Sequence, residues 1–556
     1  STMPTFHSLR CRTAELRERL TISPLLLTVL TITFMFCVDN GTFWVIAADV
    51  FSGHLISLIG YMAALFLLTL AAFSLFAFPW TVKPFLISML ILAAMTSYYI
   101  DTLGIIIDRD MIQNIMVTTV SESRHLITAG YVTHGVIFGI LPSLVVICVR
   151  IRPQRAVRAA VTPILTCVLS FALAAGLLMA DLKSYSSILR ERKDFMSSYQ
   201  PGAPLVAAIR YAKMMSRSAE LDLASTGTDA QTGAAYEAPQ KPMLTIVVAG
   251  ETARAQNFSL NGYDVDTNPE LAQLPIINFS NAQSCGTATA VSLPCMFSKF
   301  SRDTYSYENG TSTENVLDVL GHAGLHVEWW DNNTGDKGIA ARFKTRKFTD
   351  LNNSEFCSTG ECMDGIFIEP LKDYISSITE DTVLVLHQMG SHGPTYYQRY
   401  PEDFERFKPA CRSSEFKKCT PQEITNAYDN TIAYTDHILA RIIGMLSADD
   451  RLATSLIYMS DHGESLGEHG LYLHGAPYFM APETQTHVPM ILWLSDAFKT
   501  RFGIDESCVA AQENNPLSHD NLFHSLLGLL NIDTAERNAD LDIFSSCKTR
   551  VELAKI

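Results

Sequence analysis

The sequence predicts a two-part protein, with an N-terminal α-helical membrane domain of five transmembrane helices and a C-terminal α/β domain with a mostly parallel central sheet. The chain of 556 residues is too long for a single hydrophobic core. Its residues are 48% apolar although its net charge is -15, a combination that indicates a membrane part joined to an acidic soluble part. Apolar runs are long from residue 24 to 181 and shorten to strand length after about residue 241. We therefore expect a membrane domain over 1–181, an amphipathic bridge and linker over 182–240, and the α/β domain over 241–556.

The acidic balance also excludes one class of partner. Binding to nucleic acid needs clustered Lys and Arg to neutralise phosphates, whereas acidic residues outnumber basic ones here, 57 to 42. We therefore expect no nucleic-acid partner.

Five apolar runs are each near the length of about 20 residues with which a helix crosses a bilayer. They cover residues 24 to 46, 54 to 78, 82 to 103, 128 to 149 and 157 to 180. The N-terminal arginines, Lys83 and the basic run 150–155 fall on one side if the N-terminus is cytoplasmic. Five crossings then place the C-terminal domain outside, and the alternative is that one of the five spans is re-entrant. The loop of about 101–127 lies on the outer side, where it serves as a connector or lies on the membrane surface.

Cysteine spacing supports an oxidising compartment for the C-terminal domain. Its eight cysteines include no C-x-x-C pair, and an even number of locally spaced cysteines is typical of disulfides rather than of a zinc knuckle. They group as Cys285 with Cys295, Cys357 with Cys362, Cys411 with Cys419, and Cys508 with Cys547.

After the bridge, short β-rich runs alternate with helical segments. The runs M-L-T-I-V-V-A-G, T-V-L-V-L-H, S-L-I-Y-M-S and V-P-M-I-L-W-L are typical of central strands that helices cover on both faces. Helices are expected over 203–215, 313–320 and 426–446, and a linker over 216–240. Together they predict the α/β domain.

Potential metal ligands follow these strands, at the edge where catalytic groups gather in such sheets. They are Glu251, His387 with His392, and Asp461 with His462. Two carboxylates and an imidazole from separate strands can bind Zn²⁺. Each residue alone is more often a helix cap or an ordinary polar residue, but S-D-H-G-E-S-L-G-E-H-G-L-Y-L-H holds an unusual density of imidazoles for a solvated loop.

The stretch S-C-G-T-A-T-A-V-S-L-P-C-M, Ser284 to Met296, is typical of a constrained loop that presents a nucleophile. Thr287 and Thr289 are both candidates on this pattern. The alternative is a surface turn closed by a disulfide around ordinary threonines.

Four stretches together resemble the phosphoethanolamine transferases that modify lipid A, a family that includes the mobile colistin resistance enzymes. They are G-E-T-A-R at 250–254, S-C-G-T-A-T-A-V-S-L-P-C-M-F-S at 284–298, G-S-H-G-P-T-Y-Y at 390–397 and S-D-H-G-E-S-L-G at 460–467. The resemblance covers nearly the whole chain, and its C-terminal half is similar to the alkaline phosphatase and sulfatase superfamily.

This resemblance implies a set of site residues. The zinc ligands would be Glu251, Thr289, Asp461 and His462, with Thr289 as the nucleophile. His392 or His474 would protonate the leaving group, and the choice between them stays open. Substrate contacts are implied for Asn114, Thr118, Glu122, Asn333, Lys337 and Glu464. Many members flank the lysine as G-C-K-G-V-C, whereas this chain has G-D-K-G-I-A and so lacks one disulfide, and His469 has no implied role.

The implied activity is zinc-dependent transfer of phosphoethanolamine from phosphatidylethanolamine to a lipid A phosphate through a phosphoethanolamine-threonine intermediate. One Zn²⁺ is expected to bind tightly, and a second during turnover stays open. The enzyme is expected to act as a monomer in the bacterial inner membrane, with its catalytic domain in the periplasm, and to give resistance to polymyxin and other cationic peptides. The acceptor phosphate stays undecided.

Four other functions are alternatives to this one. A phosphoglycerol transferase of the lipoteichoic acid synthase type, or transfer to another envelope glycan, shares the plan, although the disulfide-closed loop argues against the former. A sulfatase needs a C/S-x-P-x-R motif, whereas Cys295 is followed by M-F-S. A binding module with an inactive fold would have lost at least one metal ligand.

Overall fold

The computed structural model describes residues 21–238 and 240–549, which tertiary contacts divide into two compact units. We call the first the helical unit; it comprises residues 21–109 and 127–209. The second, the α/β unit, comprises residues 110–126 and 210–549. Residues 110–126 thus pack with the α/β unit although the helical unit flanks them in sequence. The three domain limits expected from the sequence stay a prediction.

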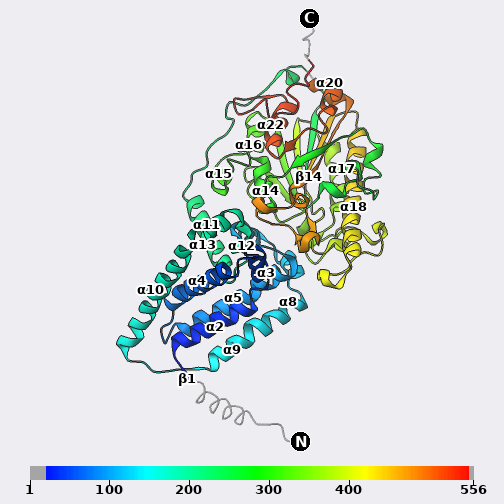
Figure 1. Ribbon diagram of the computed structural model, residues 1–556. Helices are drawn as coiled ribbons and strands as arrows, with labels where there is room; N and C mark the ends of the chain where they lie inside the picture. The colour runs from blue at the N-terminus through cyan, green and yellow to red at the C-terminus, as the bar shows by residue number, and fades with distance from the viewer. Residues whose placement is uncertain (1–20, 239, 550–556) are drawn as a thin grey trace. The chain divides into compact units, whose positions relative to one another are not determined.

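The helical unit contains the apolar helices that the sequence predicts (Figure 1). Within residues 21–238 and 240–549, four helical runs are long and apolar enough to cross a bilayer: α4 (Leu55–Ser74), α5 (Val82–Leu103), the run Ala129–Cys148, and α10 (Ala156–Ala180). The third run consists of α8 (Ala129–His134), a π-helical segment (Gly135–Ile140) and α9 (Leu141–Cys148). A fifth candidate is the pair α2 (Pro24–Val38) and α3 (Gly41–Val50). The N-terminal helical membrane region is thereby confirmed.

The first predicted span is bent rather than continuous. Helices α2 and α3 meet at 72°, with Asp39 and Asn40 at the break. The Asn40 amide donates to the carbonyls of Met35 and Gln200 at 2.9 and 3.0 Å, and its oxygen accepts from the Gln200 backbone N–H at 2.7 Å. These bonds satisfy backbone groups near the end of α2, as a helix break in an apolar environment requires.

The rest of the helical unit is α11 (Leu182–Glu191), α12 (Lys193–Ser197) and the start of α13 (Gly202–Ala219). The predicted helix over 203–215 is present, but it continues to Ala219, so residues 216–219 of the predicted linker are helical. A two-residue strand, β1 (Thr21–Ile22), pairs with β2 (Arg150–Ile151).

An eight-stranded sheet forms the centre of the α/β unit, in the order β15-β5-β14-β11-β4-β10-β6-β7. The strands are β4 (Met243–Gly250), β5 (Ile277–Gln283), β6 (His326–Asp331), β7 (Lys344–Lys347), β10 (Thr382–His387), β11 (Ala453–Ser460), β14 (His487–Leu494) and β15 (Leu517–Ser518). Only β14 is antiparallel to its neighbours. Every residue of β4, β10 and β11 is buried, which explains their continuous apolar sequence.

Helices cover both faces of this sheet (Figure 1). Helices α14 (Thr289–Phe297), α16 (Val316–His322) and α22 (Asp520–Leu529) lie on one side, and α17 (Ile368–Ser377) and α18 (Pro421–Ser447) on the other. The first group packs against alternate strand residues, among them Val247, Val385 and Ile457. The predicted helices over 313–320 and 426–446 correspond to α16 and α18. The mostly parallel α/β fold is therefore confirmed.

The register of the parallel strands sets the position of the site. Ser460 at the end of β11 pairs with Gly250 at the end of β4, and His387 at the end of β10 pairs with Ala249. The residues that follow these strands must therefore emerge together at one edge of the sheet.

Candidate active site

Three potential metal ligands meet where β4 and β11 end. Ligand atoms of Glu251, Asp461 and His462 all lie within 4.8 Å of one another, and the three side chains are fully buried. The His462 Nε2 atom lies 3.3 Å from Glu251 Oε1 and 3.5 Å from Asp461 Oδ2. Its Nδ1 atom lies 2.8 Å from the Gly463 carbonyl, an arrangement that leaves Nε2 to bind a metal.

This cluster fits a divalent cation. Burial raises the pKa of Asp461 to about 7, and repulsion from Glu251 adds to the effect. Asp461 Oδ2 is buried and has no hydrogen-bond partner among the described residues. The two buried carboxylates are faced by the imidazoles of His462 and His387, 3.3 and 3.9 Å from Glu251. Such a buried acidic cluster favours a positive charge, and Zn²⁺ accepts a mixed set of oxygen and nitrogen ligands.

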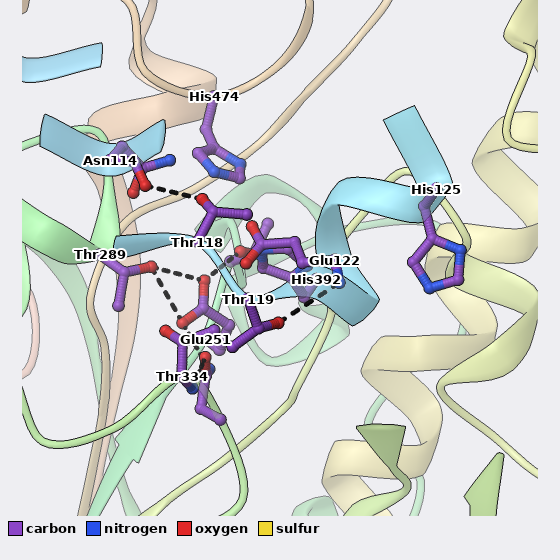
Figure 2. Close-up of polar contacts among 12 residues, drawn as sticks. Asn114, Thr118, Thr119, Glu122, His125, Glu251, Thr289, Thr334, His392 and His474 are labelled. Atoms are coloured by element: carbon purple, nitrogen blue, oxygen red, sulfur yellow. Dashed lines mark hydrogen bonds and ion pairs between the residues drawn. The ribbon is translucent and has the colours of Figure 1, made fainter. Parts of the chain in front are cut away.

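Thr289 brings a hydroxyl to the cluster from the first turn of α14. Its Oγ1 atom donates to the two carboxylate oxygens of Glu251 at 3.0 and 3.1 Å (Figure 2). The same Oγ1 atom lies 3.3 Å from His462 Nε2. Thr289 is the first residue of the helix, where backbone N–H groups and the helix dipole favour an anion such as phosphate.

The other candidate, Thr287, contacts a different part of the chain. Its hydroxyl donates to the Ala476 carbonyl at 2.6 Å, and its own carbonyl accepts from the Gly475 backbone N–H at 2.9 Å. Thr287 therefore fixes the loop against residues 475–476, while the Thr289 hydroxyl reaches the cluster.

Several bonds hold the loop before α14 in place. The Cys285–Cys295 disulfide joins it to the helix, and the Ser292 hydroxyl accepts from the Gly286 N–H at 2.8 Å. The buried His519 accepts from the Cys285 N–H through Nδ1 at 2.9 Å, and its Nε2 donates to the Ser460 carbonyl at 2.9 Å. Burial lowers the pKa of His519 to about 4, so it is neutral and can do both. His519 thus ties the loop to the end of β11.

The remaining disulfides are Cys357–Cys362, Cys411–Cys419 and Cys508–Cys547. Among the described residues, the free cysteines Cys37, Cys148 and Cys167 all belong to the helical unit. All four pairs grouped from the sequence are present in the α/β unit.

Two buried histidines near the cluster have pKa values shifted in opposite directions. Burial opposes protonation of His392, but Glu122 at 3.0 Å outweighs it and raises the pKa of His392 to about 9. Burial and repulsion from His462 lower the pKa of His474, although Glu464 lies 3.0 Å from it. At neutral pH, His392 therefore carries a proton that His474 lacks.

Glu122 comes from the segment predicted as an outer loop, which forms α6 (Arg109–Val117) and α7 (Val120–Leu126). Burial raises the pKa of this carboxyl, but His392 overcomes the effect and holds it below the usual value. Glu122 thus meets His392 as an ion pair. Thr118, by contrast, donates its hydroxyl to the Asn114 carbonyl at 2.7 Å (Figure 2).

The other predicted contacts differ in position. Asn333 donates to Glu251 Oε2 at 2.8 Å and to the Gln388 carbonyl at 2.7 Å. The Lys337 ammonium binds the carbonyl and hydroxyl of Thr334 at 2.8 and 2.6 Å, so its described hydrogen bonds do not reach the carboxylates of the cluster. Burial lowers the pKa of Lys337.

A cavity of about 230 Å³ opens beside Asn333 and His392. Its lining includes Thr119, Ser121, Glu122, Asn333, Glu361 and His392. Both α7 and residues that follow the sheet therefore form its wall.

Some residues around the cluster were not singled out from the sequence. The Thr252 hydroxyl donates to Glu251 Oε1 at 2.7 Å, and Asp331 lies 2.9 Å from His387 Nδ1. Glu361 and Arg399 form an ion pair at 2.7 Å. Thr252 and Asp331 directly follow or end strands, a signal that could have identified them; Glu361 and Arg399 carry no such signal.

Comparisons with known proteins agree across both units. A family model described as "Phosphoethanolamine transferase EptA/EptB" matches residues 65–215, and one described as "Sulfatase" matches residues 244–532. Phosphoethanolamine transferase EptA of Escherichia coli K12 is 41% identical over 481 residues, which cover 85% of this chain and 87% of that protein.

Two further relatives cover still more of the chain. Phosphatidylethanolamine transferase Mcr-1 of Escherichia coli is 35% identical over 95% of this chain and 98% of that protein. The integral membrane lipooligosaccharide phosphoethanolamine transferase A of Neisseria meningitidis superposes with a TM-score of 0.91 at 35% identity, over 95% of this chain and 99% of that structure.

Proposed function

The chain belongs to the phosphoethanolamine transferase family, and from this membership and the geometry of the site we propose that it transfers phosphoethanolamine from phosphatidylethanolamine to a lipid A phosphate. The observation that carries the proposal is the Thr289 hydroxyl, which lies within hydrogen-bond distance of Glu251 and His462 in a buried cluster. A hydroxyl held by such groups is typical of an activated nucleophile.

Glu251, Asp461, His462 and Thr289 would hold one Zn²⁺. When bound, the cation lowers the pKa of the threonine hydroxyl and offsets negative charge on the phosphoryl oxygens. The buried Asp461 Oδ2, which has no hydrogen-bond partner among the described residues, and the His462 Nε2 atom, which faces Glu251 and Thr289, support this assignment.

In the first half of the reaction, Thr289 Oγ1 forms a bond to the phosphorus of phosphatidylethanolamine. The bond between phosphorus and the diacylglycerol oxygen breaks, and Thr289 loses its proton on the Glu251 side, where its hydrogen bonds lie. The N-terminus of α14 supplies a favourable field for the phosphoryl oxygens. The product is phosphoethanolamine bound to Thr289.

The diacylglycerol oxygen needs a proton as it leaves, and His392 is the better donor. Its pKa of about 9 keeps it protonated at neutral pH, whereas the pKa of His474 is lowered. His392 Nε2 is paired with Glu122, while Nδ1 is buried without a partner among the described residues and is free to donate to substrate.

In the second half, a lipid A phosphate oxygen attacks the same phosphorus. The bond between phosphorus and Thr289 Oγ1 breaks, Thr289 takes back the proton that it gave up on the Glu251 side, and His392 regains its proton from water. The transferred group adds an ammonium that offsets a phosphate charge, so weaker binding of polymyxin and other cationic peptides follows. The four disulfides of the α/β unit support a periplasmic position for it, with the apolar helices in the inner membrane.

The test compares Thr289→Ala with Thr287→Ala in the purified full-length chain given phosphatidylethanolamine alone. Mass spectrometry should find a phosphoethanolamine adduct on Thr289 in the wild type and in Thr287→Ala, and none in Thr289→Ala. With lipid A added, Thr289→Ala should transfer nothing. An adduct on Thr287, or transfer by Thr289→Ala at the wild-type rate, would overturn the proposal.

A further inference from the structure

A short disulfide-closed hairpin contacts α7. Its strands are β8 (Cys357–Ser358) and β9 (Glu361–Cys362), and Cys357 is bonded to Cys362. The two turn residues, Thr359 and Gly360, have φ values of 55° and 87°, as a two-residue hairpin turn requires. A Cβ atom at Gly360 would overlap Ser121 Oγ on α7. The hairpin turn therefore lies directly against α7.

Glu361 connects this hairpin to both α7 and the loop that carries His392. The side chain is buried, and its Oε2 atom lies 3.0 Å from His125 Nε2 and 2.7 Å from Arg399 NH1. Burial would raise the pKa of Glu361, but the Arg399 charge and the His125 hydrogen bond hold it well below its usual value. Glu361 is thus a carboxylate shared between α7 and Arg399.

Arg399 in turn holds the backbone of His392. Its Nε atom donates to the His392 carbonyl at 2.6 Å, and NH2 donates to the Thr395 hydroxyl at 3.3 Å. The arginine side chain is only 2% exposed, so water does not compete for these bonds.

These contacts form a closed ring, which runs from His392 through Glu122, His125, Glu361 and Arg399 back to His392. Glu122 and His125 are three residues apart on α7 and therefore share a face of the helix. Glu122 binds the His392 side chain, while His125 reaches the His392 carbonyl through Glu361 and Arg399. One helix thus fixes both the side chain and the main chain of His392.

We propose that His125, Glu361 and Arg399 are positioning residues that transmit the docking of α7 to His392. The inference rests on the proposed function, in which His392 protonates the leaving diacylglycerol oxygen. The ring holds His392 in position while α7 is docked, and loss of the contacts to α7 opens the ring at Glu122 and at His125. Helices α6 and α7 lie in sequence between the apolar helices α5 and α8, so the segment that carries α7 is tied to the membrane part at both ends.

Kinetics of the full-length chain in phosphatidylethanolamine vesicles with lipid A test this inference. The variants are His125→Ala, which leaves the Glu361 and Arg399 pair intact, and Glu361→Gln, which keeps the size of the side chain. The matched control is Glu355→Gln, an exposed glutamate near the same hairpin. We expect kcat to fall about tenfold in both test variants, the effect of losing one charge-assisted hydrogen bond. KM for the donor and the control should stay near the wild type.

A double-mutant cycle separates positioning from a general structural role. In a His392→Ala background, His125→Ala and Glu361→Gln should cause no further loss of kcat, because their effect passes through His392. A further tenfold loss in that background, or a wild-type kcat for both single variants, would overturn the inference.

Hydrogen exchange without substrate gives a readout that does not depend on the reaction. Backbone amides of residues 120–126 and 389–393 should exchange faster in His125→Ala and Glu361→Gln than in the wild type or Glu355→Gln. If the wild type transfers no phosphoethanolamine, the proposed function fails, and faster exchange would still support the ring. If the wild type is active and hydrogen exchange in the two variants is unchanged, His125 and Glu361 do not position His392.

Discussion

Replacing Glu122 with glutamine should move the pH dependence of the proposed transfer reaction, in which His392 is the proton donor. The change keeps the size of the side chain but removes the negative charge 3.0 Å from His392 Nε2. His392 is buried and is faced by Glu122, Glu251, Glu361, Arg399 and His474. Burial and Arg399 both disfavour its protonated form, and Glu122 is the strongest of the groups that favour it.

The size of the shift follows from the raised pKa. His392 has a pKa of about 9, against an ordinary histidine value of 6.5. This difference corresponds to ~3 kcal/mol in favour of the imidazolium. Without the Glu122 charge, the pKa should fall by about 2 units, because a nearby opposite charge contributes 1–3 units in such sites.

The assay is kcat/KM for diacylglycerol release between about pH 6 and about pH 10. The wild type should keep its activity until the pH approaches 9, where His392 loses its proton. Glu122→Gln should lose activity about 2 units lower, so that at pH 8 its kcat/KM is at least ~10-fold below the wild type. Glu355→Gln should follow the wild-type profile.

The ion pair of Glu122 and His392 also predicts how the stability of the folded chain changes with pH. His392 has a higher pKa in the folded chain than when unfolded, so its contribution is fully present below about pH 6.5 and is lost as the pH rises through about 9. The melting temperature of the wild type should therefore fall over this range more than that of Glu122→Gln. If kcat/KM falls at the same basic pH in the wild type and in Glu122→Gln, Glu122 does not set the pKa of His392.

Two further predictions concern the cation and the loop disulfide. Removing the cation with a chelator should lower the melting temperature by a few degrees more at pH 8 than at pH 5. Without the cation, Asp461 has a pKa of about 7 against 3.8 unfolded, so folding loses stability as the pH rises between these values; an equal drop at both pH values would contradict this. Reducing the Cys285–Cys295 bond should lower activity about tenfold before circular dichroism detects unfolding, because the bond holds the Thr289 loop to α14 while the rest of the core is intact. Full activity after mass spectrometry has shown both thiols free would mean that the bond has no part in positioning Thr289.

Local patterns in the sequence were enough to predict both the helical membrane part and the α/β part of the protein. Apolar runs of about 20 residues mark the membrane helices, and short β-rich runs mark the buried strands, since each signal depends only on neighbouring residues. Glu251, Asp461 and His462 could be predicted as a cluster because they follow strands whose ends meet at one edge of a parallel sheet. The family resemblance then distinguished Thr289 from Thr287.

Only the tertiary structure decided which distant groups meet. It bends the first predicted span at Asp39 and Asn40, and it packs residues 110–126 with the α/β unit rather than with their sequence neighbours. It also joins His125 to Glu361 across 236 positions, and Glu361 to Arg399 across 38. No periodicity encodes such contacts. They depend on where folding places whole helices and loops, so the sequence by itself determined the elements and the reactive groups, and packing determined how those groups are held.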